Sequence, residues 1–128
     1  MTMMERADSD RPARQRGAKA VTPSVPVDLA HLRRFTAGNR ALEREVLDLF
    51  VEQAPRTLRA MQLAGSEKIW LDAAHTLKGS AFAIGANVIA RTAAEAELLR
   101  GQPQRWPEVL SRLEQAIRDA RNFIEIAA

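Results

Sequence analysis

The apolar residues between positions 70 and 84 constrain the fold of this chain more than any other feature. Most recur at steps of three or four residues: Trp70, Ala73, Ala74, Leu77, Ala81 and Ile84. That spacing places them on one face of an α-helix, and such a face is normally buried against neighbouring elements. Ser66 is suited to cap the start of this helix and Gly85 to end it. The sequence therefore predicts a central helix with one buried face.

Three further long segments show the same periodicity. The first should begin near Asn39 and continue past Pro55 as one bent helix, because its apolar pattern resumes in register after the proline. The second should be capped by Asn87, and the third should follow a loop at 101–106 with Pro107 in the first helical position. Their expected buried positions are, in turn, Leu42, Val46, Leu49, Phe50, Leu58 and Met61; Val88, Ile89, Ala93, Ala96 and Leu99; and Val109, Leu110, Leu113, Ile117, Ala120 and Ile124.

A shorter apolar segment precedes these four. Asp28 can cap a helix that runs through Leu29, Leu32 and Phe35, and Gly38 would end it. Residues with β-branched side chains are too scattered along the chain to form alternating strands. We therefore expect an all-α protein, an antiparallel four-helix bundle with a short extra N-terminal helix.

The positive charge of the chain is concentrated at its N-terminal end. The formal net charge is +3. Lys and Arg outnumber Asp and Glu by five to three in residues 1–25, but only by fourteen to thirteen in residues 26–128. Residues 1–26 also lack apolar periodicity, so we expect a disordered basic tail followed by one helical domain over 27–128. A nearly balanced domain disfavours nucleic acid as a partner, since such binding requires a basic face.

Composition excludes several other classes. The chain has no cysteine, which excludes a disulfide framework and a thiolate metal site. Glu95 and Glu97 have no histidine near them in sequence, whereas metal sites in helical bundles typically use Glu-x-x-His pairs. No run of residues has the apolar length of a membrane span, and no signal peptide is recognisable. We therefore expect a cytoplasmic protein without membrane association, and its evenly charged surface favours a monomer.

The residues with chemical potential lie off the buried stripe of the central helix. Helical geometry places His75 on a face that it shares with Asp72, Lys78, Gly79 and Phe82. A glycine inside a helix costs about 1 kcal/mol relative to alanine. Helical side chains lean toward the N-terminus, so a side chain at position 79 would lean over His75, and glycine leaves the imidazole accessible. Lys78 can bring a mobile ammonium to the same patch, which suits a transient anion such as a phosphoryl group.

The motif His-x-Leu-Lys-Gly-Ser, with Gly-Ala ten residues after the histidine, resembles the histidine-containing phosphotransfer (HPt) domains of two-component phosphorelays. The matching residues are His75, Leu77, Lys78, Gly79, Ser80, Gly85 and Ala86. Weaker similarity runs through Asp28-Leu29, Phe50, Pro55 and Arg100-Gly101, so that the resemblance covers most of the chain after residue 27.

The resemblance implies a phosphoryl carrier. His75 would accept a phosphoryl group and exchange it with aspartates of response-regulator receiver domains, and the donor would be such a receiver or a sensor histidine kinase of the hybrid type. Lys78 would stabilise the phosphate charge, and Gly79 would keep His75 accessible. No nucleotide-binding motif is present, so we expect no autonomous kinase activity and no cofactor. Any Mg²⁺ would belong to the partner receiver domain.

Four residues near His75 are candidates for partner docking: Leu71, Asp72, Phe82 and Glu97. Phe82 could instead pack in the core against the final helix. Glu97 stands where some HPt domains place a polar side chain that hydrogen-bonds the imidazole, and an ordinary exposed glutamate is the alternative. His31 has no evident partner in the sequence and is given no function. The competing function is a helical interaction module whose histidine is not phosphorylated.

Overall fold

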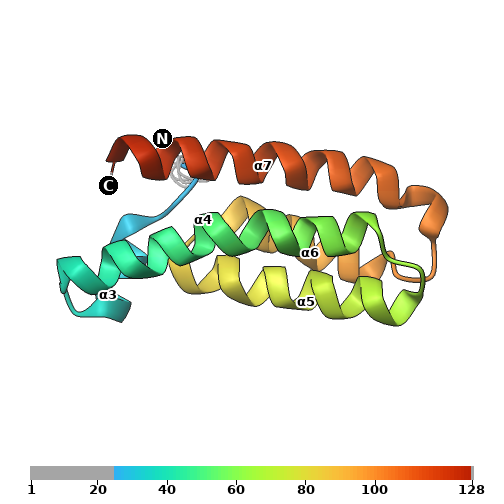
Figure 1. Ribbon diagram of the computed structural model, residues 1–128, viewed down its shortest axis with the longest axis horizontal. Coiled ribbons are helices and arrows are strands. Elements are labelled where there is room, and N and C mark those ends of the chain that lie inside the picture. The colour runs from blue at the N-terminus through green and yellow to red at the C-terminus, as the bar shows by residue number, and fades with distance from the viewer. Residues whose placement is uncertain (1–24, 128) are drawn as a thin grey trace, which may run out of the picture.

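The computed structural model describes residues 25–127, and within this range the chain forms five α-helices and one 3-10 turn. The elements are α3 (Leu29–Thr36), α4 (Arg40–Gln62), α5 (Glu67–Ile84), α6 (Asn87–Leu98), η2 (Pro103–Arg105) and α7 (Trp106–Ala127). Figure 1 shows the four long helices side by side, with α3 at one end. Each long helix packs against two others, in the order α4, α5, α6, α7 and back to α4. The predicted bundle is confirmed, whereas the predicted tail lies almost entirely outside the described residues.

The predicted N-caps Asp28 and Ser66 are present, and Asn39, near which the next helix was expected to begin, caps α4. Side-chain oxygens of Asp28, Asn39 and Ser66 accept hydrogen bonds from the backbone N–H groups of His31, Leu42 and Ile69, at 3.2, 3.0 and 3.2 Å. Each cap satisfies a donor that the first helical turn cannot pair internally. The long helix α4 continues through Pro55 without interruption, as expected for one helix rather than two.

Two predicted helix starts are wrong by one residue. Ala86, not Asn87, occupies the N-cap position of α6 and makes no side-chain hydrogen bond. The reason is the tightness of the turn, because only Gly85 and Ala86 separate α5 from α6. Pro107 is the second residue of α7, because the 3-10 turn at Pro103–Arg105 leads directly into the helix at Trp106.

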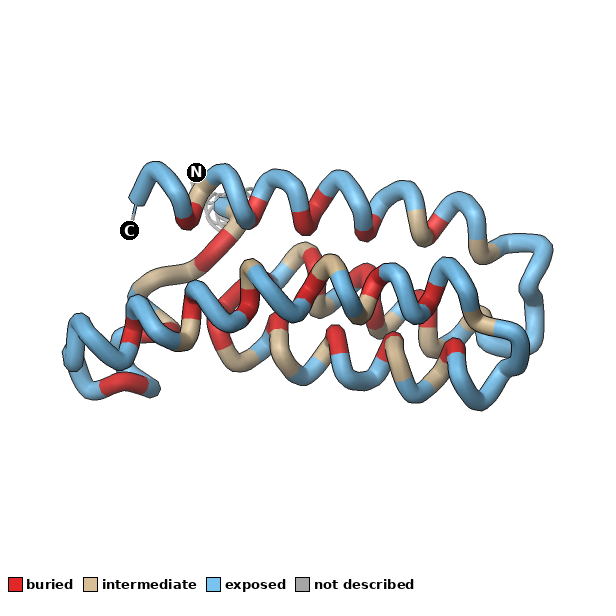
Figure 2. Tube along the Cα trace, in the orientation of Figure 1, coloured by how far each residue is buried: buried red, intermediate tan, exposed pale blue. Residues whose placement is uncertain are grey.

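The core is a single cluster enclosed by the helices, and Figure 2 shows buried positions spaced along each long helix. In α5 the predicted stripe is confirmed, with only Ala73 half-buried. In α4 the predicted face is partly wrong, because Leu42 and Leu49 are exposed. The buried face consists of Glu43, Leu47, Phe50, Ala54, Leu58 and Met61. The apolar residues of α4 fit two overlapping helical patterns, and packing selects the pattern that contains Glu43, which pairs with Arg33 of α3 at 3.3 Å.

The other two predicted faces are close to the observed ones. In α6 the buried residues are Ile89, Thr92, Ala93 and Ala96. In α7 they are Val109, Leu113, Ala116, Ile117, Ala120 and Ile124. The predicted residues Val88, Leu99 and Leu110 are half-buried instead. None of the described helices is long and apolar enough to cross a membrane.

Gly85 joins the end of α5 to the start of the domain. It adopts a φ of 79°, in the left-handed region that favours glycine. Its carbonyl oxygen accepts a hydrogen bond from the N–H of Asp28 at 2.9 Å, and a β-carbon built on Gly85 would lie 2.7 Å from the Asp28 carbonyl oxygen. The close approach therefore requires glycine, and it fixes α3 beside the C-terminal end of α5.

Candidate functional site

His75 lies in the middle of α5 on the face opposite the core. Its side chain is 72% exposed, whereas Ala74 and Leu77 beside it are fully buried. The helical register that buries Trp70 and Leu77 therefore presents the imidazole to solvent. This exposure agrees with the expectation from the sequence.

Glu97 of α6 links the two polar residues of that face. One carboxylate oxygen, Oε2, lies 2.8 Å from Nδ1 of His75, and the other, Oε1, accepts a hydrogen bond from Nζ of Lys78 at 2.7 Å. The Glu97 side chain is only 16% exposed. Glu97 therefore lies between α5 and α6 as a support for His75 and Lys78, and not as an outward docking residue.

The carboxylate determines which imidazole nitrogen is free. An ionised carboxylate only accepts hydrogen bonds, so Nδ1 of His75 must carry the proton in this contact. In the neutral ring, Nε2 then holds the lone pair, and it forms no hydrogen bond with any of the residues 25–127. Partial burial acts to raise the pKa of Glu97, but the hydrogen bonds from Lys78 and His75 and their charges outweigh it, so the pKa lies below its ordinary value of 4.5. The carboxylate is therefore ionised at neutral pH.

His75 lines a surface depression of about 640 Å³. The residues around it are Leu71, Asp72, His75, Lys78, Glu97, Leu98 and Arg100. Three of the predicted docking residues thus lie near the histidine, although Asp72 also forms an ion pair with Lys68 at 2.7 Å. Two lining residues, Leu98 and Arg100, were missed. Arg100 lies in the turn after α6, where its N–H donates to the Glu97 carbonyl oxygen at 3.3 Å, so its place beside Glu97 depends on how that helix ends.

The two cations in this depression differ in their pairing. The ammonium of Lys78 is held by Glu97 at 2.7 Å, so it is less mobile than expected from the sequence. Arg100 forms no ion pair with any residue in the described part of the chain. An anion that enters the depression therefore finds one partly neutralised cation and one whose charge is uncompensated.

Gly79 has open space around it. A β-carbon built on this residue would meet no atom within 4 Å. The fold therefore does not need glycine here for packing, and the space beside His75 is available to a ligand or partner. From the sequence, a side chain at position 79 was expected to cover His75, but the methyl group of an alanine there would not touch the imidazole ring. A longer side chain would be needed to reach it.

Phe82 lies outside the depression, and it does not pack against the final helix. Its exposed ring lies edge-on to the ring of His31 in α3, with centroids 5.6 Å apart and an angle of 67° between the planes. This contact could not be predicted from the sequence, because it depends on how α3 packs beside α5. Phe82 lies on α5, seven residues beyond His75.

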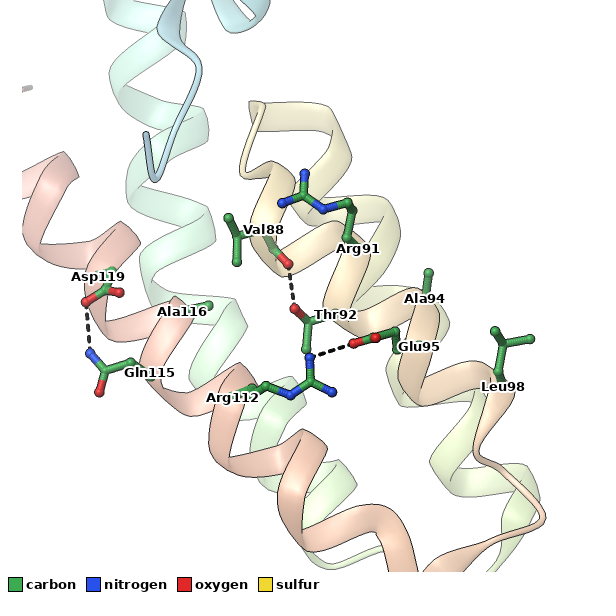
Figure 3. Close-up of a pocket in the computed structure, with 10 residues that line it drawn as sticks. All are labelled: Val88, Arg91, Thr92, Ala94, Glu95, Leu98, Arg112, Gln115, Ala116 and Asp119. Atoms are coloured by element: carbon green, nitrogen blue, oxygen red, sulfur yellow. Dashed lines mark hydrogen bonds and ion pairs between the residues drawn. The ribbon is translucent and has the colours of Figure 1, made fainter. Parts of the chain in front are cut away.

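A separate groove of about 700 Å³ lies between α6 and α7 (Figure 3). Arg112 of α7 donates a hydrogen bond across it to Glu95 of α6 at 2.7 Å. Beside them, the hydroxyl of Thr92 donates to the Val88 carbonyl at 2.7 Å. Gln115 also donates a hydrogen bond to Asp119 at 2.9 Å, so most polar groups of this groove are paired with one another, and no histidine lines it. Leu98 lines both this groove and the depression around His75.

Comparison with known proteins gives a family and a fold. The model of the Hpt domain family matches residues 45–123. A search of the curated proteins finds no match. Among solved structures, the chain is similar to histidine-containing phosphotransfer protein B (HptB) from Pseudomonas aeruginosa PAO1. The TM-score is 0.74 and the identity 23%, over 81% of this chain and 95% of that one, which shows a shared fold.

Proposed function

The chain belongs to the Hpt domain family and is a histidine phosphotransfer protein of phosphorelays, and we propose that Nε2 of His75 is the atom that takes the phosphoryl group. The observation that carries this proposal is the pairing of His75 with Glu97. It leaves an exposed imidazole whose Nδ1 is engaged and whose Nε2 is free.

The transfer step follows from this arrangement. The Nε2 lone pair attacks the phosphorus of an aspartyl phosphate on a receiver domain, forming a P–N bond as the P–O bond to the aspartate breaks. The aspartate leaves with the electron pair as a free carboxylate, and the reverse reaction restores the neutral imidazole. Because Nε2 carries no proton in the tautomer that Glu97 selects, no general base is needed. Positive charge that develops on the ring is stabilised by Glu97 through Nδ1.

Lys78 and Arg100 give the depression its affinity for an anion. An ammonium has three donors, so Lys78 can keep its hydrogen bond to Glu97 and still donate to a phosphoryl oxygen. The charge of Lys78 also offsets that of Glu97, which would otherwise repel the phosphoryl group. Arg100 adds a guanidinium, which can bind phosphate oxygens in a bidentate manner. Phosphoryl transfer depends mainly on such positioning and charge stabilisation.

Proteins of this family exchange phosphoryl groups with receiver domains and kinases. For this chain we propose receiver domains as direct partners, with a hybrid sensor histidine kinase as the source of phosphate. The Mg²⁺ of the reaction would be held by the receiver, and the chain would not phosphorylate itself. A monomer in the cytoplasm suits this role. The docking residues would be Leu71, Asp72 and Phe82.

A transfer assay tests the proposal and separates it from an interaction module with an inert histidine. Receiver domains carrying labelled aspartyl phosphate are mixed with the protein, which should acquire acid-labile, alkali-stable label as a phosphoramidate does. His75→Gln should abolish labelling without loss of helical content. His31→Gln is the matched control, since the chain has two histidines, and it should still be labelled. Label that persists in His75→Gln would contradict the assignment.

A further inference from the structure

The two tryptophans of the chain form a stacked pair at the end of the bundle where α5 and α7 begin and α6 ends. The rings of Trp70 and Trp106 lie 4.0 Å apart between centroids with an angle of 3° between their planes. Trp70 comes from α5 and is fully buried, and Trp106 is the first residue of α7. The stack therefore connects two helices that are not neighbours in sequence.

Both indoles donate a hydrogen bond to the C-terminal end of α6. Nε1 of Trp70 donates to the carbonyl oxygen of Ala96, and Nε1 of Trp106 donates to the carbonyl oxygen of Leu99, each at 2.7 Å. Each carbonyl also accepts a backbone hydrogen bond, from the N–H of Leu99 at 3.1 Å and of Gln102 at 2.8 Å. The carbonyl groups at a helix end lack the regular partner four residues further along, so each indole adds a second donor beside the backbone N–H.

The α6 helix depends on these contacts for its position. It has 12 residues, a length at which an isolated helix is only marginally stable in water. Its N-cap makes no side-chain hydrogen bond, and its last turn contains no basic residue. Tertiary contacts must therefore hold the C-terminal turn in place.

That turn carries Glu97. The two carbonyl groups held by the indoles belong to the residue before Glu97 and to the second residue after it. Trp70 and His75 belong to the same helix, so the bond from Trp70 to Ala96 also ties α5 to α6 near the contact between His75 and Glu97. A displacement of this turn would move the Glu97 carboxylate directly, because the Glu97 side chain alone connects the α6 backbone to the imidazole of His75.

We propose that Trp70 and Trp106 are positioning residues for phosphotransfer, which hold the end of α6 so that Glu97 meets His75 and Lys78. The inference rests on the proposed role of His75. Loss of either indole N–H lets the turn shift, and the fraction of His75 with a proton on Nδ1 falls. A misplacement of about 1 Å can reduce a rate on the order of a hundredfold, so a partial shift should cost about tenfold.

The test uses the full chain with the variants Trp106→Phe and Trp70→Phe. Each keeps an aromatic ring in the stack and removes one N–H donor. Phe123→Leu is the matched control, since it alters a half-buried aromatic residue of α7 at the opposite end of that helix. The tautomers of His75 are measured by nitrogen-15 NMR of the imidazole, and phosphotransfer from a labelled receiver is measured in the same preparations.

We expect the control to melt at a lower temperature but to keep the parent tautomer and rate. Trp106→Phe should melt lower as well, with less Nδ1–H tautomer and about tenfold slower transfer. Trp70→Phe should show the larger change. If both tryptophan variants keep the parent tautomer ratio and rate, the pair serves stability alone and the inference is overturned. If the tryptophan variants shift the tautomer ratio but the parent protein itself takes no label, the positioning role is supported and the proposed phosphotransfer is refuted.

Discussion

The two carboxylate oxygens of Glu97 contact two residues of α5, His75 and Lys78, and these contacts make the stability of the fold depend on pH. The pKa of Glu97 is lowered in the folded chain, so its carboxylate contributes stability above the unfolded pKa of about 4.5. This contribution is lost as the pH falls through the lower, folded pKa. Glu97→Gln has no such group and should lack this part of the pH dependence.

The corresponding measurement is the free energy of unfolding of the parent and Glu97→Gln at pH 7 and at pH 3. The advantage of the parent should be larger at pH 7 than at pH 3, because protonation of the carboxylate removes its ionic contact with Lys78 and weakens its hydrogen bond from His75. A difference between parent and variant that stays constant from pH 7 to pH 3 would show that the contacts add nothing in solution.

Substitutions at Gly79 can distinguish access to His75 from fold stability, because a side chain there should stabilise the helix but slow phosphotransfer. Alanine in a helix interior should stabilise the fold by roughly 0.5 to 1 kcal/mol, and a methyl group at this site meets no other atom. Transfer should be slowed modestly by alanine and on the order of a hundredfold by Gly79→Gln, whose longer side chain reaches the space where the phosphoryl group and the receiver's aspartate meet. Both melting temperature and transfer rate are measured.

Lys78→Ala provides the contrast for Gly79. It removes a charge but opens the depression, so transfer should slow without being blocked. If Gly79→Gln transfers phosphate as fast as the parent protein, the open space beside His75 has no role in access.

At the level of elements, Gly85 behaves differently from Gly79. Gly85→Ala places a β-carbon at 2.7 Å from the Asp28 carbonyl oxygen and requires alanine to adopt a φ of 79°. Strain of this kind costs about 1 to 3 kcal/mol, so the variant should be less stable than the parent. Urea unfolding of Gly79→Ala and Gly85→Ala should therefore show shifts in opposite directions. A Gly85→Ala protein as stable as the parent would mean that the turn relaxes freely.

The same elements show how far sequence reasoning extends. Caps such as Ser66 could be predicted because the donor and the acceptor lie three residues apart. The buried face of α4 could be predicted only in part, because Leu42 and Leu47 both fit helical patterns and only packing distinguishes them. The hydrogen bond from His75 to Glu97 depends on the spacing of α5 and α6, which the indole of Trp70 helps to set. Resemblance indicated a polar residue at that position, but not that it also holds Lys78 or that Arg100 stands nearby.

Over the whole molecule, a receiver domain can cover only some of the exposed apolar residues. Leu98 ends α6, is 80% exposed and lines the depression that contains His75. Apolar residues beside a reactive group are typical of the centre of an interface. Ile126 in the last turn of α7 is similarly exposed, at 87%, but it does not line that depression. These two residues therefore form a matched pair for testing where the partner docks.

Leu98→Ser should raise the KM for a phosphorylated receiver by about tenfold, since one buried apolar contact is worth on the order of 1 to 2 kcal/mol at an interface. The melting temperature should change little, because the side chain is already in water in the free protein. Ile126→Ser should change neither quantity. Transfer rates over a range of receiver concentrations separate KM from kcat. Equal effects of the two substitutions would place the receiver away from Leu98, and the aromatic pair of Phe82 and His31 on the other side of the histidine would then be the surface to vary next.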